Sequence, residues 1–406
     1  MNALKRLYCR AYQLGFRAAM PLLPYRSPEL LPRLPAVVPL LQGKHIPSVL
    51  LVADATVRRL GLTAPLEKQL MRSGIACAVY EQATPNPTVA DVERAKEEYL
   101  RHGAGAMIAI GGGSAMGCAK VAGARVACPR KSVSQMKGLL HIHTRTPLLI
   151  AVPTTAGSGS ETTLAAVITD SENHHKYLIN DFALIPDYAV LDPEMTVGLP
   201  PFVTATTGLD ALTHAVEAYI GRSTTAYTRV MCEEAVRLIR ENLECAVENG
   251  DNREARRSML RASYCAGTAF TRSYVGYMHG VAHSLGGQYG IAHGLANAVL
   301  LPVFLRLYGG SCRAKLARLA RRSGLCAASV PDTEAAERFI AWIEGMNRAF
   351  GLPVGFAEIR EEDIPHMAAN AGAESNPLYP APRLMDAKQL EAVYRRVMLT
   401  EAFHDD

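Results

Sequence analysis

The first half of the chain alternates short, continuous apolar runs with longer stretches in which apolar residues recur every three or four positions. Such short runs, bounded by polar or glycine residues, are typical of strands that are buried on both faces. The longer stretches predict helices, and strands that alternate with helices predict a parallel α/β sheet. The expected strands are residues 48–53, 75–80, 106–110, 148–152 and 165–169.

The pattern changes near residue 199, and long helical spacings dominate from there onward. Helices are expected over residues 205–220, 224–249, 252–272, 275–286, 293–308, 312–323, 332–350, 361–371 and 386–402. We therefore predict three parts. They are a basic, proline-rich leader (1–42), an α/β domain with a parallel, Rossmann-like sheet (43–199) and an all-α domain (200–406).

The leader contains a basic amphipathic segment, residues 1–20, followed by a proline-rich connector, residues 21–42, which we expect to be non-helical or broken. Lys5, Arg6, Arg10 and Arg17 alternate there with leucine and aromatic residues. This pattern favours a helix that packs on the protein's own body or on a partner subunit. Contact of residues 1–20 with a membrane surface is the less favoured alternative, and it stays open.

Composition limits the function classes only broadly. The chain has 406 residues, 49% of them hydrophobic, and a net charge of +5 with acidic and basic residues interspersed, so we expect a globular protein without a nucleic-acid surface. The nine cysteines are odd in number and show no CxxC pair, which favours a reducing, cytoplasmic location.

Five candidate metal ligands cluster in two segments of the helical half. Asp210 and His214 are four residues apart, and His279 and His283 repeat this spacing, which places each pair on one helix face. His293 follows after a glycine break. One carboxylate with several imidazoles suits Fe2+ or Zn2+ better than Mg2+ or Ca2+. The spacing does not decide which four would bind.

Two loops at the carboxyl ends of predicted strands are candidates for one extended ligand. Gly111-Gly112-Gly113-Ser114 opens a helix after the strand 106–110, and a loop rich in Ser, Thr and Gly (153–163) follows the strand 148–152. Backbone amides at such a helix start can hold a pyrophosphate, so the two loops together favour a dinucleotide. Asp54, at the end of the first strand, could then meet a ribose hydroxyl and would repel a 2′-phosphate.

Four motifs in this order resemble the iron-containing (group III) alcohol dehydrogenase family. They are GGGSAMGCAK, PTTAGSGSETT, GLDALTHAVEAYI and MHGVAHSLGGQYGIAHGLANAVLLP, and the segment from Ser375-Asn376-Pro377 to Arg396 resembles the family's closing loop and helix. The resemblance covers roughly residues 45–400. It implies a dehydroquinate synthase-like architecture, in which an NAD-binding α/β domain precedes a helical metal-binding catalytic domain, with the active site in the cleft between them.

The resemblance also implies roles for single residues. The metal ligands would be Asp210, His214, His279 and His293, and His283 would be the catalytic histidine near nicotinamide and substrate. The cofactor NAD would be held by Asp54, Asn86, Gly111, Gly112, Gly113, Ser114, Thr154, Thr155, Ser158 and Lys176.

The sequence departs from the family pattern where the substrate would lie. Phe270, Arg272 and Tyr274 stand before His279, where relatives commonly have small or amide side chains, so they could recognise a polar or anionic group. Ser158, Ser284 and Ala292 also replace common family residues, but these differences remove no ligand.

We therefore expect a metal-dependent, NAD-linked alcohol dehydrogenase or aldehyde reductase, with Fe2+ or Zn2+, a small alcohol or aldehyde as substrate, and a homodimeric state. A dehydroquinate synthase-like lyase would need a phosphate-binding cluster of Lys and Arg near the metal, which we do not find near the motifs. A metal-independent maleylacetate reductase would lack some of the ligands. A non-catalytic NAD- or metal-binding sensor or scaffold stays open as the alternative from another class.

Overall fold

The computed structural model describes residues 1–84, 86–170 and 175–399, except for the side chains of residues 175–177. The chain divides into two compact units. The sheet unit comprises Pro24–Leu199 and Gly250–Thr271, and the helical unit comprises Met1–Leu23, Pro200–Asn249 and Arg272–Asp406.

The sheet unit is built on six strands in the order β1-β9-β6-β4-β2-β3, and every pair is parallel. A second, three-stranded sheet has the order β5-β8-β7. The elements are β1 (Glu29–Leu31), α2 (Val37–Gly43), β2 (Ser48–Val52), α3 (Ala55–Arg59), α4 (Ala64–Arg72), β3 (Ala76–Tyr80), α5 (Val89–Arg101), β4 (Ala106–Gly111), α6 (Gly113–Ala127), β5 (Gly138–Leu139), β6 (Leu148–Pro153), β7 (Ala165–Asp170), β8 (His175–Asn180) and β9 (Tyr188–Val190). The predicted parallel α/β sheet is confirmed.

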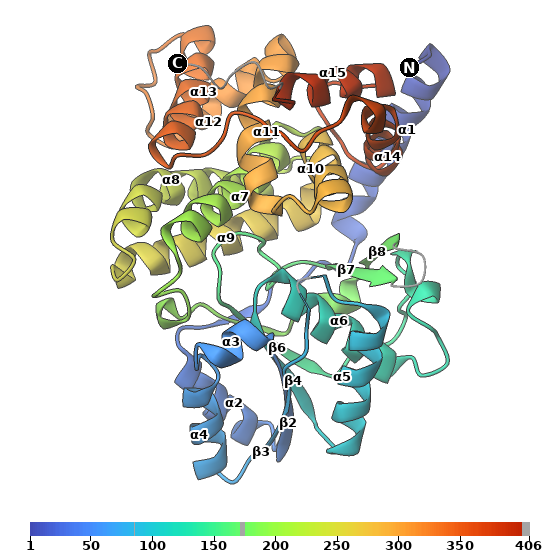
Figure 1. Cartoon of the computed structure of the whole chain (residues 1–406), viewed down its shortest axis with the longest axis vertical. Helices are drawn as coiled ribbons and strands as arrows, with labels where there is room; N and C mark the ends of the chain where they lie inside the picture. The colour runs from blue at the N-terminus through green and yellow to red at the C-terminus, as the bar shows by residue number, and fades with distance from the viewer. Residues whose placement is uncertain (85, 171–174, 400–406) are drawn as a thin grey trace. The chain divides into compact units, whose positions relative to one another are not determined.

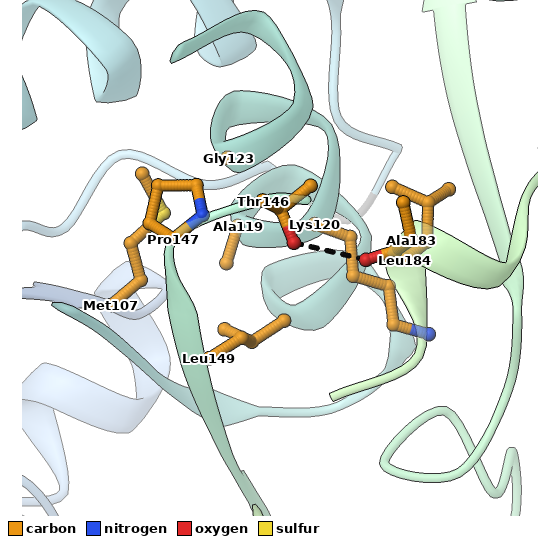
Figure 2. A pocket seen from close by; sticks show the side chains of 9 residues that line it. All are labelled: Met107, Ala119, Lys120, Gly123, Thr146, Pro147, Leu149, Ala183 and Leu184. Carbon is orange, nitrogen blue, oxygen red and sulfur yellow. Dashed lines mark hydrogen bonds between the residues drawn. The ribbon is translucent and has the colours of Figure 1, made fainter. Parts of the chain in front are cut away.

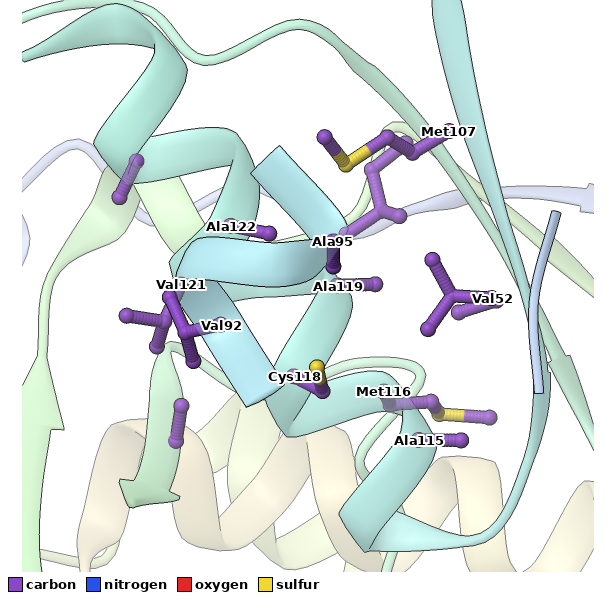
Figure 3. Packing of buried hydrophobic residues seen from close by; sticks show 14 of the residues in the cluster. Val52, Val92, Ala95, Met107, Ala115, Met116, Cys118, Ala119, Val121 and Ala122 are labelled. Atoms are coloured by element: carbon purple, nitrogen blue, oxygen red, sulfur yellow. The ribbon is translucent and has the colours of Figure 1, made fainter. Parts of the chain in front are cut away.

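The apolar runs fill two cores because successive side chains of a strand point to opposite faces. Leu50 and Val52 face α5 and α6, whereas Val49 and Leu51 face α2, α3 and α4. Figure 1 shows these two helix layers on either side of the strands, and Figure 3 shows the first core, where α5 and α6 meet the sheet. Helices on both faces explain why the strands are apolar throughout.

Two expectations for the sheet unit need correction. The strand at residues 165–170 belongs to the small sheet, where β7 pairs antiparallel with β8, and not to the main sheet. Part of the proline-rich connector has regular structure, since it forms β1 and α2. Proline is tolerated there because Pro28 and Pro32 flank the edge strand and Pro39 lies in the first turn of α2, where no helical N–H bond is lost.

The helical unit places three helices of the candidate site next to one another. The helix α7 packs against α8 and α11, and α10 packs against α11 and α14. The elements are α1 (Ala3–Ala19), α7 (Pro201–Ile220), α8 (Ala226–Glu248), α10 (Tyr277–Tyr289), α11 (His293–Tyr308), α12 (Arg313–Arg322), α13 (Asp332–Ala349), α14 (Ile364–Ser375) and α15 (Ala387–Val397). The helix α9 (Arg253–Ser273) is divided between the two units.

All nine cysteines carry free thiols. Among the described residues, no single helix is long and apolar enough to cross a membrane, and one bent pair, residues 293–311 with 313–322, meets that criterion jointly by length and composition.

Candidate metal centre and cofactor loops

Four of the five candidate ligands converge on one point of the helical unit. Asp210 and His214 lie one turn apart on α7, His279 lies in the first turn of α10, and His293 opens α11. One ligand atom from each lies within 4.8 Å of all the others. His283 lies beside this group, with its ring centroid 5.1 Å from that of His293. The geometry therefore separates a set of four from the fifth histidine, which the spacing alone could not do.

Asn297 stands at the centre of this cluster and was missed by the sequence analysis. It is fully buried, and its Nδ2 lies 2.7 Å from Asp210 Oδ1, 3.1 Å from His293 Nε2 and 3.3 Å from His279 Nε2. The amide group has two N–H donors, one of which is directed at Asp210 Oδ1, and the two imidazole nitrogens lie within reach of the same group. Polar atoms of three candidate ligands therefore surround one buried amide. The only sequence signal is that Asn297 lies one turn after His293.

Glu217 fixes the orientation of His279. Its Oε2 lies 2.6 Å from His279 Nδ1, and the carboxylate also accepts the backbone N–H groups of Gly276 and Met278 at 2.8 and 3.1 Å. These contacts assign the proton of His279 to Nδ1, so the lone pair of Nε2 faces the cluster. Burial lowers the pKa of His279 well below its usual range, which keeps the ring neutral. Burial also raises the pKa of Glu217, and hydrogen bonds from the backbone N–H groups of Gly276, Met278 and His279 act in the opposite direction.

The close approach of Glu217 requires a glycine at position 276. A Cβ atom there would lie 2.4 Å from Glu217 Oε1, well inside van der Waals contact. Gly276 is also the N-cap residue of α10, so its N–H is one that the helix itself leaves unpaired. The Glu217 carboxylate on α7 therefore accepts N–H groups at the start of α10, the helix that carries His279.

A second carboxylate holds His283. Glu374 Oε1 lies 2.6 Å from His283 Nδ1 and accepts the hydroxyl of Tyr379 at 2.8 Å. Burial raises the pKa of Glu374, but the charge of His283 and hydrogen bonds from His283 and Tyr379 outweigh it, so that the pKa lies below its ordinary value. Glu374 was also missed, although it stands two residues before the Asn376-Pro377 pair that the sequence analysis singled out.

The two predicted cofactor loops lie side by side in the sheet unit because β4 and β6 are neighbours. The backbone N–H of Thr154 donates to Gly111 O at 3.1 Å. A Cβ atom on Gly113 would lie 3.1 Å from Ser160 Oγ and 3.5 Å from Ser158 Oγ. The hydroxyls of the second loop therefore face the start of α6, where Gly112 is the N-cap. A helix start opened by glycines, with hydroxyls facing it, could hold a phosphate.

Asp54 lies at the same edge of the sheet. It caps α3, with Oδ1 accepting the N–H of Val57 at 2.8 Å, and its Oδ2 would be 3.7 Å from a Cβ atom on Gly111. Asn86 is exposed in the turn before α5. Lys176 lies on β8, but its side chain is outside the part of the chain that the structure describes.

A buried lysine ties the second loop to α6. Lys120 Nζ donates to Thr163 O at 2.8 Å, to Thr163 Oγ1 at 2.9 Å and to Ala165 O at 3.1 Å. Figure 2 shows its aliphatic part along a narrow cavity beneath α6, with the ammonium group reaching beyond it. Burial lowers the pKa of Lys120 to about 7, and the buried carboxyl of Glu161 acts in the opposite direction. This anchor fixes the loop that carries Thr154, Thr155 and Ser158.

The three candidate substrate residues lie at or just after the end of α9, where the chain passes from the sheet unit to the helical unit. Phe270 lies on α9 in the sheet unit, whereas Arg272 and Tyr274 belong to the helical unit. The guanidinium of Arg272 lies 4.8 Å from the ring centroid of Tyr227, and Tyr274 meets Phe16 edge-on with ring centroids 5.1 Å apart. These contacts give Arg272 and Tyr274 packing partners of their own.

Comparison with known proteins finds two family matches that together span most of the chain. Residues 28–193 match the family "Iron-containing alcohol dehydrogenase", and residues 204–398 match "Fe-containing alcohol dehydrogenase family, C-terminal". The chain is 36% identical over 324 residues to NAD-dependent methanol dehydrogenase of Bacillus methanolicus, covering 79% of this chain and 85% of that protein.

Two further comparisons extend over more of the chain. It is 35% identical over 361 residues to 1,3-propanediol dehydrogenase of Klebsiella pneumoniae, covering 88% of this chain and 92% of that protein. Among solved structures, a 1,3-propanediol oxidoreductase is similar with a TM-score of 0.87 at 33% identity, covering 92% of this chain and 99% of that one.

Proposed function

The chain belongs to the iron-containing alcohol dehydrogenase family, and from this premise we infer that it is an NAD-linked oxidoreductase that interconverts a small alcohol and its aldehyde. Its architecture is the dehydroquinate synthase-like one that the motifs implied. The observation that carries the inference is the convergence of one carboxylate and three imidazoles within 4.8 Å on three packed helices. A lyase or a maleylacetate reductase is not needed to explain any feature of this site.

We propose that Asp210, His214, His279 and His293 hold one divalent ion, Fe2+ or Zn2+. The donor set supports this, because one carboxylate and three imidazoles each offer one ligand atom within 4.8 Å of the others. When bound, the ion supplies Lewis acidity toward the substrate oxygen, and NAD supplies or accepts the hydride. The protein's own part is to keep the imidazoles neutral and fixed, which Glu217 does for His279.

The cofactor loops would bind NAD through backbone and hydroxyl groups. The amides at Gly111, Gly112, Gly113 and Ser114 would hold the pyrophosphate, and Thr154, Thr155 and Ser158 would contact it from the second loop, which the facing geometry of the two loops supports. Asp54 at the neighbouring strand end would favour NAD over NADP. Asn86 and Lys176 stay predictions of the family pattern.

His283 is proposed as the residue that exchanges the substrate's proton. Its Nδ1 is hydrogen-bonded to Glu374, and Nε2 is proposed as the ring nitrogen that exchanges the proton. The stacked position beside His293 supports this assignment. Glu374, held in turn by Tyr379, would orient the ring and stabilise it whenever it carries a second proton.

The substrate is proposed to be a short alcohol, diol or aldehyde. The similar proteins are named for methanol and 1,3-propanediol, and Phe270, Arg272 and Tyr274 are proposed to lie on the substrate's side of the site. A cytoplasmic location is supported by the nine free thiols. The homodimeric state stays a prediction, which sedimentation at several protein concentrations would test.

The test is purification without oxygen or chelator, followed by metal analysis and by assays of NADH and NADPH formation. The panel holds short alcohols, diols and hydroxy acids, with Fe2+ or Zn2+ restored to the stripped protein. We expect metal-dependent NADH formation with at least one short alcohol. A folded, metal-loaded protein that binds NAD and oxidises nothing in the panel would favour the sensor or scaffold instead.

A further inference from the structure

The N-terminal helix α1 has one face that is fixed to the helical unit. Gln13 is buried, and its Nε2 donates to Pro377 O at 3.0 Å and to Tyr379 O at 2.9 Å. Arg10 donates to Ala381 O at 2.9 Å and to Pro382 O at 3.1 Å. Because these acceptors are backbone carbonyls of one segment, the helix is held in a single orientation. The helix is thus anchored to the segment 377–382, which precedes α15.

The opposite face of α1 exposes an apolar ridge. The exposed fractions are 78% for Leu4, 68% for Leu7, 59% for Tyr8 and 67% for Leu14. At 3.6 residues per turn these side chains occupy an arc of about 120°, and Leu22, 87% exposed, follows just after the helix. Large leucines that cluster in this way mark an interaction surface, because scattered single residues are the usual case on soluble proteins. Figure 1 shows α1 at the edge of the helical unit, beside α14.

Several cations flank this ridge, and one acid, Asp386, accepts the N-terminal ammonium of Met1. Lys5, Arg6 and Arg17 are exposed on α1, and the chain has no acidic residue before Glu29. Arg17 Nη1 donates to Arg222 O at 3.3 Å.

Lys315 adds another cation at the same place, since its Nζ donates to Ile220 O at 3.0 Å, two residues before Arg222. Burial, and then the charges of Arg17, Arg229 and Arg222, lower the pKa of Lys315 to about 8. Within the described residues none of Arg17, Arg222, Arg229 and Lys315 forms an ion pair. The positive charge is therefore left for a partner.

We propose that α1 docks the protein on an anionic lipid surface, with the leucine ridge inserted at the headgroup boundary and the cations against the phosphates. A convex ridge of Leu and Tyr flanked by Lys and Arg is the arrangement of helices that lie in a membrane interface. Pairing with α1 of a second copy would bring two basic helices together, which like-charge repulsion opposes. The family matches cover residues 28–193 and 204–398, so α1 lies outside the matched residues, whereas Arg222, Arg229 and Lys315 lie within them.

The contributions of charge and of apolar contact to vesicle binding should be separable by substitution. A basic residue near an anionic bilayer contributes about 1 kcal/mol, which corresponds to about fivefold in the partition constant. Replacing Lys5 and Arg6 by Gln should therefore weaken vesicle binding by about 25-fold at low salt. The loss should shrink as added salt screens the charges. Replacing Leu7 and Leu14 by Gln removes inserted side chains while keeping helix propensity, and it should reduce binding at every salt concentration.

The experiment is co-sedimentation of the full-length protein with vesicles of phosphatidylcholine alone or mixed with phosphatidylglycerol. The control variant is Met71→Gln with Leu100→Gln, which changes two exposed apolar residues (74% and 56%) of the sheet unit. NADH formation in solution should be the same in all four proteins, because none of the changed residues belongs to the metal centre or the cofactor loops.

Binding to the anionic vesicles only, lost in both α1 variants and kept in the control, is the expected result. Absence of binding by the native protein would overturn the proposal, as would equal loss in the control. Concentration-dependent self-association without vesicles, abolished by Leu7→Gln with Leu14→Gln, would assign the ridge to a second copy instead. These outcomes do not depend on the dehydrogenase assay, so the docking proposal and the enzymatic one fail separately.

Discussion

Replacement of Glu217 by Gln tests how far the metal centre depends on a residue that would not touch the ion. The native carboxylate accepts three N–H donors, from Gly276, Met278 and His279, at 2.6–3.1 Å. Glutamine has the same shape, but its NH2 group would replace one of the two oxygens that now accept hydrogen bonds. That NH2 group would then face an N–H donor of Gly276, Met278 or His279, and the hydrogen bond between them would be lost.

The magnitude follows from the hydrogen bonds that are lost. A hydrogen bond to a charged group contributes about 1.5–3 kcal/mol, which corresponds to roughly one to two orders of magnitude in an equilibrium constant. The same range, about 10–100-fold, is typical for changes to partners that orient a metal-binding histidine. We therefore expect Glu217→Gln to weaken metal binding by about 10–100-fold and to leave NADH binding unchanged.

The assay is competition between the protein and a chelator of known affinity, followed by metal analysis of the protein fraction. Glu233→Gln is the matched control, since Glu233 accepts the hydroxyl of Tyr219 at 2.9 Å from the neighbouring helix α8 but contacts none of the four candidate ligands. Both variants should unfold at a lower temperature than the native protein, and only Glu217→Gln should lose metal. Unchanged metal affinity in a folded Glu217→Gln protein would refute the role of Glu217.

Three other changes probe the remaining parts of the site. His279→Ala should abolish metal binding and turnover together while NADH binding, followed by fluorescence, survives, and retained turnover would overturn the ligand assignment. Asp54→Ser should raise turnover with NADPH relative to NADH, because the repulsion of a 2′-phosphate is removed. An unchanged ratio of kcat/KM for the two cofactors would exclude a role of Asp54 in cofactor choice. Gly276→Ala would place a methyl group 2.4 Å from Glu217 Oε1, so about tenfold weaker metal binding is expected in the chelator assay, and native affinity would contradict the close approach.

The central strands were predictable from the sequence because each is a buried apolar run that ends in a turn. The predicted ranges 48–53 and 106–110 differ by one residue from β2 and β4. The i,i+4 spacing of Asp210 and His214 was equally informative. In a run of good helix formers this spacing places both side chains on the same helix face. The family motifs then separated roles that the spacing left open.

Other features depend on contacts between distant parts of the chain. The strand β1 was missed because its three residues pair with β9, and only that partner distinguishes Glu29–Leu31 from a loop. Glu217, Glu374 and Asn297 were missed although they stand within or beside the quoted motifs, because their helical positions alone do not show which histidine or carboxylate each one contacts. Each of them matters through a contact that only the fold creates: Glu217 with His279, Glu374 with His283, and Asn297 with Asp210.

The division of the chain has a consequence for protein engineering. Both units are assembled from separate stretches, and α9 starts in one and ends in the other. A gene fragment that begins at residue 200 would encode all four proposed ligands, yet it would lack α1 and carry the first part of α9 without the residues of the sheet unit that bury it. Exchange of catalytic halves between homologues by a single crossover should therefore yield insoluble chimaeras. Transplanting only the loops near the proposed ligands would leave the separate stretches of each unit intact.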